Sequence, residues 1–297
     1  MKVAILDAKQ GERNPANSFT VAYRNLLELK RLFNADLFVS ASEISSKSDY
    51  DAIICGFGST STERDKSTDF LVRNKGAKIY WLVGEYEQST FAPLFYSNRK
   101  FDVIRNFEHD LKNKMADKQH FVNINTLLYR NPITPIAKKY GAVYYGRWRQ
   151  DRLPYFKKYL QGNVNLSTHS KNAKMFHHNG CKPKYIRPLE WGAGKETLSL
   201  FEKSLYIEDR YTHTHYNCLA NRFYEALYCN VLPVFDRSCI NTLERSGYTG
   251  YESLIVDAPK DIDEIAHNQG LLLSWQQQAA DEKKEVLSSL KKILAGG

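Results

Sequence analysis

The chain has 297 residues, of which 42% are hydrophobic and 25% are charged, a balance typical of a folded globular protein. The 42 Lys and Arg residues outnumber the 33 Asp and Glu residues, and the formal net charge of +9 fits either ordinary solubilising charge or a polyanionic partner. No run approaches the roughly 18–20 apolar residues of a membrane-spanning helix, and the start of the chain lacks the longer apolar region of a secretory signal. We therefore expect a cytoplasmic protein that has no membrane partner. Five cysteines without CxxC spacing argue against a disulfide framework or a zinc cluster.

Strand-like runs and helical segments alternate along the first half of the chain. Residues 2–6 form a continuous apolar run of the kind found in parallel strands that are buried on both faces. Residues 18–33 follow with apolar side chains near helical spacing. Further strand-like runs lie at 35–40, 50–58 and 77–85. This alternation predicts βαβ units in a parallel sheet, as in a Rossmann-type domain.

The second half repeats this alternation after an interruption. Two prolines within residues 127–141 break the pattern, and a new cycle opens at 142–148, so we place a domain boundary between residues 137 and 138. The segments that follow are helical at 152–160 and 217–229, and strand-like at 163–168, 231–235 and 252–257. A C-terminal helix is expected at 281–294. The sequence therefore predicts an α/β protein of two Rossmann-like domains, 1–137 and 138–297, which face each other across a ligand cleft.

Glu85 comes directly after the apolar run at 77–85. A carboxylate that emerges from a sheet into a shielded site can act as a general base on a hydroxyl group. The alternative interpretation is an acidic residue at a helix N-terminus, where backbone N–H groups stabilise it.

The stretch YYGRWRQDR (144–152) is the most informative in the chain. Gly146 ends a predicted strand, and three arginines follow before the next helix: Arg147, Arg149 and Arg152. Guanidinium groups and a helix N-terminus together supply donors and positive potential to phosphate oxygens, which favours a pyrophosphate site. A solvated basic loop and a loop that contacts nucleic-acid phosphates remain as alternatives.

Arg222 and Glu225 lie one helical turn apart in the stretch NRFYEALYCNVLPVFD (221–236). At this spacing the two side chains can pair on the helix surface, which contributes only a few tenths of a kcal/mol. In the functional interpretation Glu225 accepts hydrogen bonds from a ribose diol and Arg222 binds a phosphate.

A basic and aromatic stretch at 95–120 supplies candidate DNA contacts, since positive charge mixed with Phe and Tyr suits a DNA backbone and an unstacked base, although a solvated helix face looks similar. The candidates are Arg99, Lys100, Arg105, Lys112 and Lys114. The histidines at 177–178 and 212–217 lack the carboxylate or cysteine spacing of a metal site, so we expect no metal ligands.

Four stretches of the chain resemble the DNA β-glucosyltransferase family of T-even bacteriophages, which belongs to the two-Rossmann-domain (GT-B) class. The resemblance is carried by MKVAIL at the start, AKIYWLVGE (77–85), VYYGRWRQDR (143–152) and NRFYEALYCNVLPVFD (221–236), in the same order and at similar separations. It covers most of the chain at low identity.

The resemblance implies roles for individual residues. Glu85 falls where the family has an aspartate as catalytic base, and Gly146 falls at its strand-end glycine. Arg149, Arg152 and Arg222 match arginines on the donor diphosphate, and Glu225 matches the glutamate on the donor ribose. The chain departs from the family in having Glu in place of Asp at position 85 and Arg147 in place of a serine.

The resemblance also implies an activity. We expect an inverting, UDP-sugar-dependent hexosyl- or pentosyltransferase that acts on a hydroxymethylated pyrimidine in double-stranded DNA, with a sugar such as glucose or arabinose. The first domain would bind DNA and supply the base, and the second would bind the UDP-sugar. Mg or Mn assistance is compatible with this reaction, although no ligands for it are identified. We expect a monomer in the cytoplasm of a phage host. The alternatives are a GT-B transferase acting on a glycan or lipid carrier, and a non-catalytic nucleotide- or DNA-binding protein.

Overall fold

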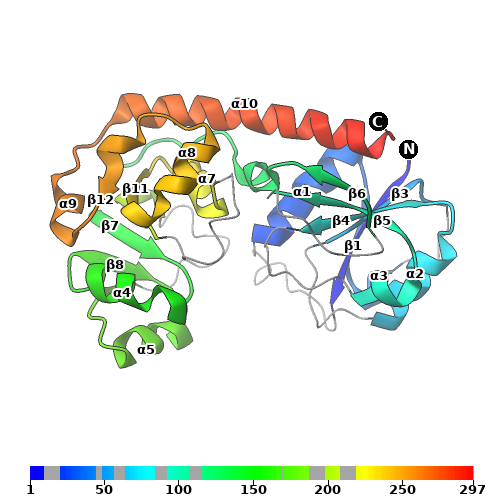
Figure 1. The fold of residues 1–297 in the computed structure, drawn as a ribbon, viewed down its shortest axis with the longest axis horizontal. Helices are drawn as coiled ribbons and strands as arrows, with labels where there is room; N and C mark the ends of the chain where they lie inside the picture. The colour runs from blue at the N-terminus through cyan, green and yellow to red at the C-terminus, as the bar shows by residue number, and fades with distance from the viewer. Residues whose placement is uncertain are drawn as a thin grey trace. The chain divides into compact units, whose positions relative to one another are not determined.

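The computed structural model describes residues 1–9, 21–44, 49–56, 64–83, 92–106, 116–168, 170–186, 198–207 and 219–296. The chain divides into two compact units: unit 1 comprises Met1–Leu128 and Lys283–Gly297, and unit 2 comprises Tyr129–Glu282. Each unit is built on a six-stranded sheet flanked by helices (Figure 1). All strand pairs are parallel, so the predicted α/β class with two Rossmann-like sheets is confirmed.

The sheet of unit 1 has the strand order β2-β1-β3-β4-β5-β6. Its strands are β1 (Val3–Lys9), β2 (Asp36–Ser40), β3 (Ala52–Cys55), β4 (Lys78–Val83), β5 (Phe101–Arg105) and β6 (Ala116–Phe121). Its helices are α1 (Val21–Phe33), α2 (Arg64–Arg73) and α3 (Ala92–Ser97). β3, β4 and β5 are almost wholly buried, as expected for central parallel strands that are covered on both faces. β5 and most of β6 fall within the basic and aromatic stretch at 95–120, which was predicted to contact DNA and was not predicted to form strands.

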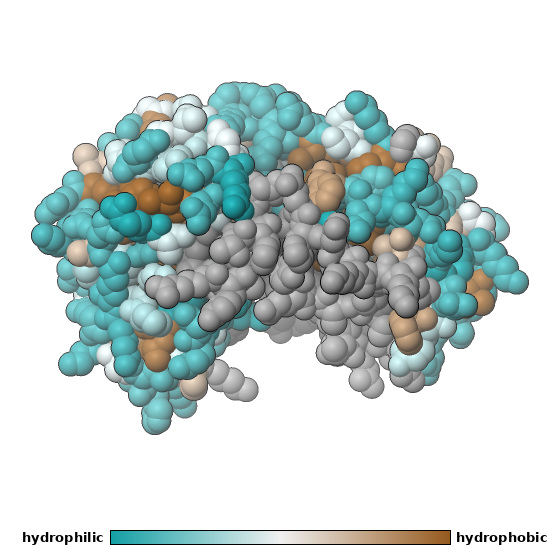
Figure 2. Space-filling model, in the orientation of Figure 1, coloured by the Kyte–Doolittle hydropathy of each residue, from teal (hydrophilic) through white to brown (hydrophobic). Residues whose placement is uncertain are grey.

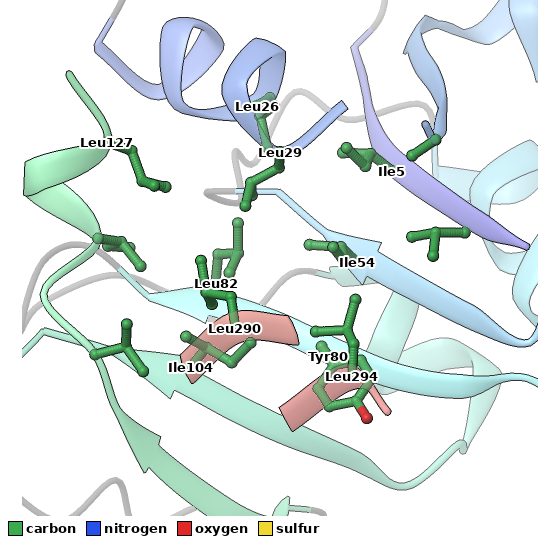
Figure 3. Packing of buried hydrophobic residues seen from close by; sticks show 14 of the residues in the cluster. Ile5, Leu26, Leu29, Ile54, Tyr80, Leu82, Ile104, Leu127, Leu290 and Leu294 are labelled. Atoms are coloured by element: carbon green, nitrogen blue, oxygen red, sulfur yellow. The ribbon is translucent and has the colours of Figure 1, made fainter. Parts of the chain in front are cut away.

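The core of unit 1 joins one face of this sheet to two helices. Ile5, Ile54 and Leu82 of the sheet pack with Leu26 and Leu29 of α1 (Figure 3). Val286, Leu290 and Leu294 belong to the same cluster and come from the end of the C-terminal helix α10 (Gln269–Leu294). The hydroxyl of Tyr80 on β4 also donates to the Ile293 carbonyl oxygen at 2.9 Å. The last turns of α10 are therefore part of the unit 1 core.

The sheet of unit 2 has the strand order β12-β11-β10-β7-β8-β9. Its strands are β7 (Tyr140–Tyr145), β8 (Val164–Ser167), β9 (Lys184–Ile186), β10 (Phe201–Tyr206), β11 (Leu232–Asp236) and β12 (Ile255–Val256). Its helices, besides the first part of α10, are α4 (Leu153–Tyr159), α5 (Ser170–His178), α7 (Asn221–Tyr228), α8 (Ile240–Ser246) and α9 (Pro259–Glu264). The left-handed backbone of Asn230, with φ of 54°, turns the chain from α7 into β11.

The division of the chain differs from the predicted one in two ways. The units separate at 128/129 instead of 137/138, because Ile133 donates its backbone N–H to Tyr228 of unit 2 and Lys138 donates to Ser199 and Asn230 there. Residues 283–297 belong to unit 1, whereas the prediction gave the whole C-terminal helix to the second domain. That helix also begins at Gln269, well before the predicted 281. Its early turns are helical because Leu272, Trp275 and Ala279 bury an apolar stripe against unit 2.

The described residues on the face seen in Figure 2 are mostly hydrophilic, with hydrophobic patches between them. Among the described helices, none combines the length and the apolar character needed to span a membrane.

Candidate functional site: a tyrosine and arginine cluster in unit 2

The site forms where two neighbouring strands of unit 2 end. β7 and β10 pair in register up to Val143 and Ser204, and each strand then continues to a buried tyrosine, Tyr145 and Tyr206. The helix α7 begins beside them at Asn221. Ligands of open parallel sheets bind beyond the carboxyl ends of the strands, so this edge is where the polar side chains matter.

Tyr145 joins the two charged residues of α7. Arg222 donates through Nη1 to the Tyr145 carbonyl oxygen at 2.9 Å, and the Tyr145 hydroxyl donates to Glu225 Oε2 at 2.9 Å. The same hydroxyl lies 3.0 Å from the Arg222 carbonyl oxygen. Arg222 and Glu225 are thus both fixed against the end of β7.

Gly146 is required by the close approach of Arg222. A Cβ atom built on Gly146 would lie 2.8 Å from Arg222 Nη1 and 3.2 Å from the Tyr144 hydroxyl oxygen. The guanidinium has little freedom to yield, because it is held by the Tyr145 carbonyl. The glycine therefore lets a cation sit directly on the strand end.

Tyr144 lies between two arginines and is fully buried. Arg152 Nη1 is 3.4 Å from its hydroxyl oxygen, and the guanidinium carbon of Arg222 lies 5.5 Å from the centre of its ring. Burial by itself would raise the pKa of the Tyr144 phenol, but the positive charges of Arg222 and Arg152 outweigh it and hold that pKa below its ordinary value. The two guanidinium groups thus make the surroundings of Tyr144 positive, which suits a phosphate group.

Arg152 is buried as well, with an exposed fraction of 5%. It lies in the turn of residues 150–152 that leads into α4. Its buried Nε has no hydrogen-bond partner among the described residues. A buried guanidinium with an unused donor costs free energy, so this position favours an anionic ligand.

The arginines predicted together in this loop are in different environments. Arg147 is exposed. Arg149 is exposed as well and contacts Asp151 at 3.0 Å and 3.2 Å. The structure therefore brings Gly146, Arg152, Arg222 and Glu225 together around the tyrosines, and leaves Arg147 and Arg149 on the outer part of the loop.

Three tyrosines of the site were missed as functional residues in the sequence. Burial, and then the negative charge of Glu225, raise the pKa of Tyr145 well above its ordinary value, and burial does the same for Tyr206. Both phenols therefore stay neutral, and that of Tyr145 serves as a hydrogen-bond donor to Glu225. Tyr144 and Tyr145 could have been found as a pair placed directly before the strand-end Gly146. Tyr206 could not, because the strand FEKSLY carries charged residues and was not predicted.

The predicted catalytic residue Glu85 lies outside the described residues. The preceding strand β4 ends at Val83, in the middle of the buried unit 1 sheet. The role of Glu85 remains a prediction.

The predicted DNA contacts of unit 1 are corrected in part. Arg99 donates to four backbone carbonyl oxygens at and beyond the end of α2, those of Leu71, Asn74, Lys75 and Ala77, at 2.8 to 3.0 Å. Its guanidinium is therefore engaged in closing the α2–β4 connection. Arg105 has an exposed fraction of 0% and cannot reach a DNA backbone as the structure stands. Lys100 is exposed and contacts Asp117 at 3.4 Å. Lys112 and Lys114 lie outside the described residues.

The chain was compared with protein families, with curated proteins and with solved structures. No family model matches it, and no curated protein matches it. Solved structures match over nearly its whole length. The DNA-modifying enzyme β-glucosyltransferase, determined in the presence and absence of uridine diphosphoglucose, matches with a TM-score of 0.68 at 14% identity, over 99% of this chain and 100% of that chain.

Two further solved structures agree. A mutant of T4 phage BGT in complex with UDP-glucose matches with a TM-score of 0.70 at 15% identity, over 99% of each chain. An α-glucosyltransferase in complex with UDP-glucose and DNA containing an abasic site matches with a TM-score of 0.59 at 12% identity, again over 99% of each chain. At these identities the likeness establishes the fold. The predicted resemblance is confirmed at that level: this chain has the GT-B fold of the phage DNA glucosyltransferases.

Proposed function

We propose that this protein is a DNA glycosyltransferase that moves a sugar from a UDP-sugar to the hydroxymethyl group of a modified pyrimidine in double-stranded DNA, with inversion at the anomeric carbon. The single observation that carries this proposal is the cluster at the end of β7, where Arg152 and Arg222 converge on Tyr144 and Tyr145 holds Glu225. The fold match supports it, since those neighbours are DNA glucosyltransferases, two of which are bound to UDP-glucose.

The donor would bind at this edge in two parts. Arg152 and Arg222 would hold the diphosphate, because both guanidinium groups are positioned before the ligand arrives and Arg152 has a donor to spare. Glu225 would accept hydrogen bonds from the ribose diol. Gly146 leaves the strand end open to Arg222, and the exposed Arg147 and Arg149 would close over the phosphates from the loop. As the bond to the sugar breaks, the arginines would stabilise the charge that develops on the departing diphosphate.

Glu85 would act as the general base. It would remove the proton from the hydroxymethyl oxygen as that oxygen attacks the anomeric carbon from the face opposite the diphosphate, which inverts the configuration. The target base would have to leave the duplex to reach such a site. Exposed cations of unit 1, with Lys100 as the described candidate, would contact the DNA backbone. We further propose a monomer that acts in the cytoplasm of a phage host.

The residues described do not fit a metal held by the protein, since they include no group of three or more His, Cys, Asp or Glu side chains that could hold one. One structural neighbour, T4 phage BGT, is known in complex with UDP and Mn²⁺.

Mass spectrometry of nucleosides tests the proposal. DNA containing hydroxymethylcytosine or hydroxymethyluracil, and matched unmodified DNA, would each be incubated with the protein and a mixture of UDP-sugars. We expect a nucleoside whose mass is increased by one sugar residue, from modified DNA alone. Glu85→Gln should abolish this product while UDP binding survives. Turnover of donors on oligosaccharides but on no DNA would instead favour a glycan-directed transferase, and UDP binding without any turnover would favour a binding protein.

A further inference from the structure

The net positive charge of the chain comes from one stretch of unit 2. Residues 147–186 contain nine Lys and Arg residues and a single acidic residue, Asp151. The rest of the chain holds 33 basic and 32 acidic residues, so this stretch supplies nearly all of the net charge of +9. Charge that only keeps a protein in solution is spread over the surface with both signs mixed, whereas a cluster of one sign indicates a polyanionic partner.

This stretch folds into a layer of two helices on one face of the unit 2 sheet. α4 and α5 lie side by side (Figure 1), and the rings of Phe156 and Phe176 pack between them with centroids 4.7 Å apart. The side-chain amide of Gln161 donates to the carbonyl oxygens of Lys157 and Gly180 at 2.9 Å and 3.4 Å. The two helices and the turns that follow them are therefore held together as one surface.

The outer side of this layer carries lysines without acidic partners. Four lysines are exposed and, within the part of the chain that the structure describes, none of them pairs with a carboxylate: Lys157 on α4, Lys174 on α5, Lys182 in the connection to β9, and Lys184 on β9. Lys158 differs from them, because it donates to the buried Asp236 at 2.9 Å. We call the exposed side of Lys157, Lys174 and Lys182 the α4–α5 surface.

The α4–α5 surface adjoins the loop of the proposed donor site. Arg152, which contacts the Tyr144 hydroxyl, is the residue directly before α4. The backbone N–H of Trp148 in the same loop donates to Asn172 Oδ1 of α5 at 3.3 Å. A polyanion bound to this surface would therefore lie next to the loop that is proposed to bind the donor.

From this arrangement we infer that the α4–α5 surface binds the phosphate backbone of the DNA duplex, so that unit 2 contacts the acceptor as well as the donor. The inference rests on the proposed function, which makes DNA the polyanion that the protein meets. It adds to the predicted DNA contacts, all of which were placed in the first domain. Lysine ammonium groups bind phosphates as point charges and read no bases. Binding at this surface is therefore independent of DNA sequence and of base modification, and it weakens as salt rises.

The salt dependence of DNA binding tests this surface. Fluorescence anisotropy of a labelled, unmodified duplex would be measured at about 50 mM and about 200 mM salt. The test variant is Lys157→Gln/Lys174→Gln/Lys182→Gln. The matched control is Lys260→Gln/Lys291→Gln/Lys292→Gln, which removes three exposed lysines of α9 and α10.

We expect the loss of affinity between the two salt concentrations to be about 40-fold smaller in the test variant than in wild type, because three phosphate contacts are removed. The control should match wild type. The Kd for UDP at the higher salt should be unchanged in both variants, which also shows that both are folded. If the test variant fails to fold, its three single variants replace it, each with a loss about 3.5-fold smaller than that of wild type.

Three results would overturn the inference. The test variant could show the salt dependence of wild type, or both triple variants could lose binding equally, so that net charge alone controls it. Wild type could also bind anionic phosphatidylserine vesicles and no DNA, which would assign the surface to a membrane. Wild type that binds DNA through these lysines but transfers no sugar would contradict the proposed function and leave this surface standing.

Discussion

The two units place their arginines in contrasting ways. In unit 2, Arg152 and Arg222 lie at a strand end, where tyrosine hydroxyl and backbone groups hold them and Arg152 keeps an unused donor. In unit 1, Arg99 gives its donors to the backbone at the end of a helix, and Arg105 lies beneath an aromatic ring. The arginines of unit 2 are thus placed for the ligand binding proposed above, whereas Arg99 of unit 1 serves the construction of the fold. The contacts of a guanidinium, and not its charge, separate the two uses.

Arg222→Ala should have the largest effect, because it removes a guanidinium group that is proposed to bind the donor diphosphate. Truncating one partner of a desolvated, hydrogen-bonded charge costs about 2–5 kcal/mol of binding, so UDP affinity should fall by about 30-fold or more. Isothermal titration with UDP measures this. Arg237→Ala is a matched control, because Arg237 is an exposed arginine of the same unit that pairs with Asp257. Equal losses in the two variants would show that net charge, and not placement, controls donor binding.

Arg99→Ala tests whether Arg99 stabilises the fold of unit 1. Hydrogen bonds from a charged donor contribute roughly 1.5–3 kcal/mol each, and the released carbonyl groups regain water, so we expect a loss of about 3 kcal/mol in the free energy of unfolding. Urea unfolding provides the measurement. Lys100→Ala should change this free energy by at most about 1 kcal/mol, because its pairing with Asp117 is at the surface. If Arg99→Ala were fully stable and instead weakened DNA binding, Arg99 would return to the DNA contacts.

Gly146→Ala tests whether the absence of a side chain at the strand end is needed for Arg222 to bind UDP. The new methyl group would press on Arg222 Nη1 and displace the guanidinium, so UDP affinity should fall by about 10-fold, which corresponds to about 1.4 kcal/mol. Gly141→Ala is the control, since a Cβ there meets nothing within 4 Å. Both variants would be titrated with UDP and checked for folding by circular dichroism. An unchanged affinity in Gly146→Ala would show that Arg222 can bind UDP from another position.

Tyr144→Phe gives the smallest effect and reports the local potential. Because the pKa of Tyr144 is lowered, wild type should contain one phenol that ionises below the usual range, seen in ultraviolet absorbance during a pH titration. A lowered folded-state pKa means that this contribution to stability is present above the unfolded pKa and is lost as pH falls through the folded pKa. The ionisation at low pH should be absent from the titration of Tyr144→Phe. It should remain in Tyr145→Phe, because the pKa of the Tyr145 phenol that this variant lacks is raised. If this ionisation also occurs in Tyr144→Phe, another phenol produces it, and a positive potential around Tyr144 is contradicted.

More of the fold than of the candidate site could be predicted from the sequence. Continuous apolar runs such as 2–6 and 77–85 identify buried parallel strands, because burial on both faces leaves little room for polar residues. β10 was missed since Lys203 lies in it, with its ammonium reaching the Ile262 carbonyl oxygen at 2.6 Å. Tyr206 was missed with it. Arg99 and Arg105 could not be told from surface cations, because their partners are backbone carbonyls and a ring distant in sequence.

In the proposed function two residues of α7 bind different parts of the nucleotide, Arg222 the diphosphate and Glu225 the ribose. Titration of Glu225→Ala and wild type with UDP and with 2′,3′-dideoxy-UDP tests it most directly. We expect Glu225→Ala to weaken UDP binding by about 10-fold and to leave binding of the dideoxy analogue unchanged, because hydrogen bonds to a charged group contribute roughly 1.5–3 kcal/mol only while the hydroxyls are present. Equal weakening for both nucleotides would contradict it and would return Glu225 to a role in holding Tyr145.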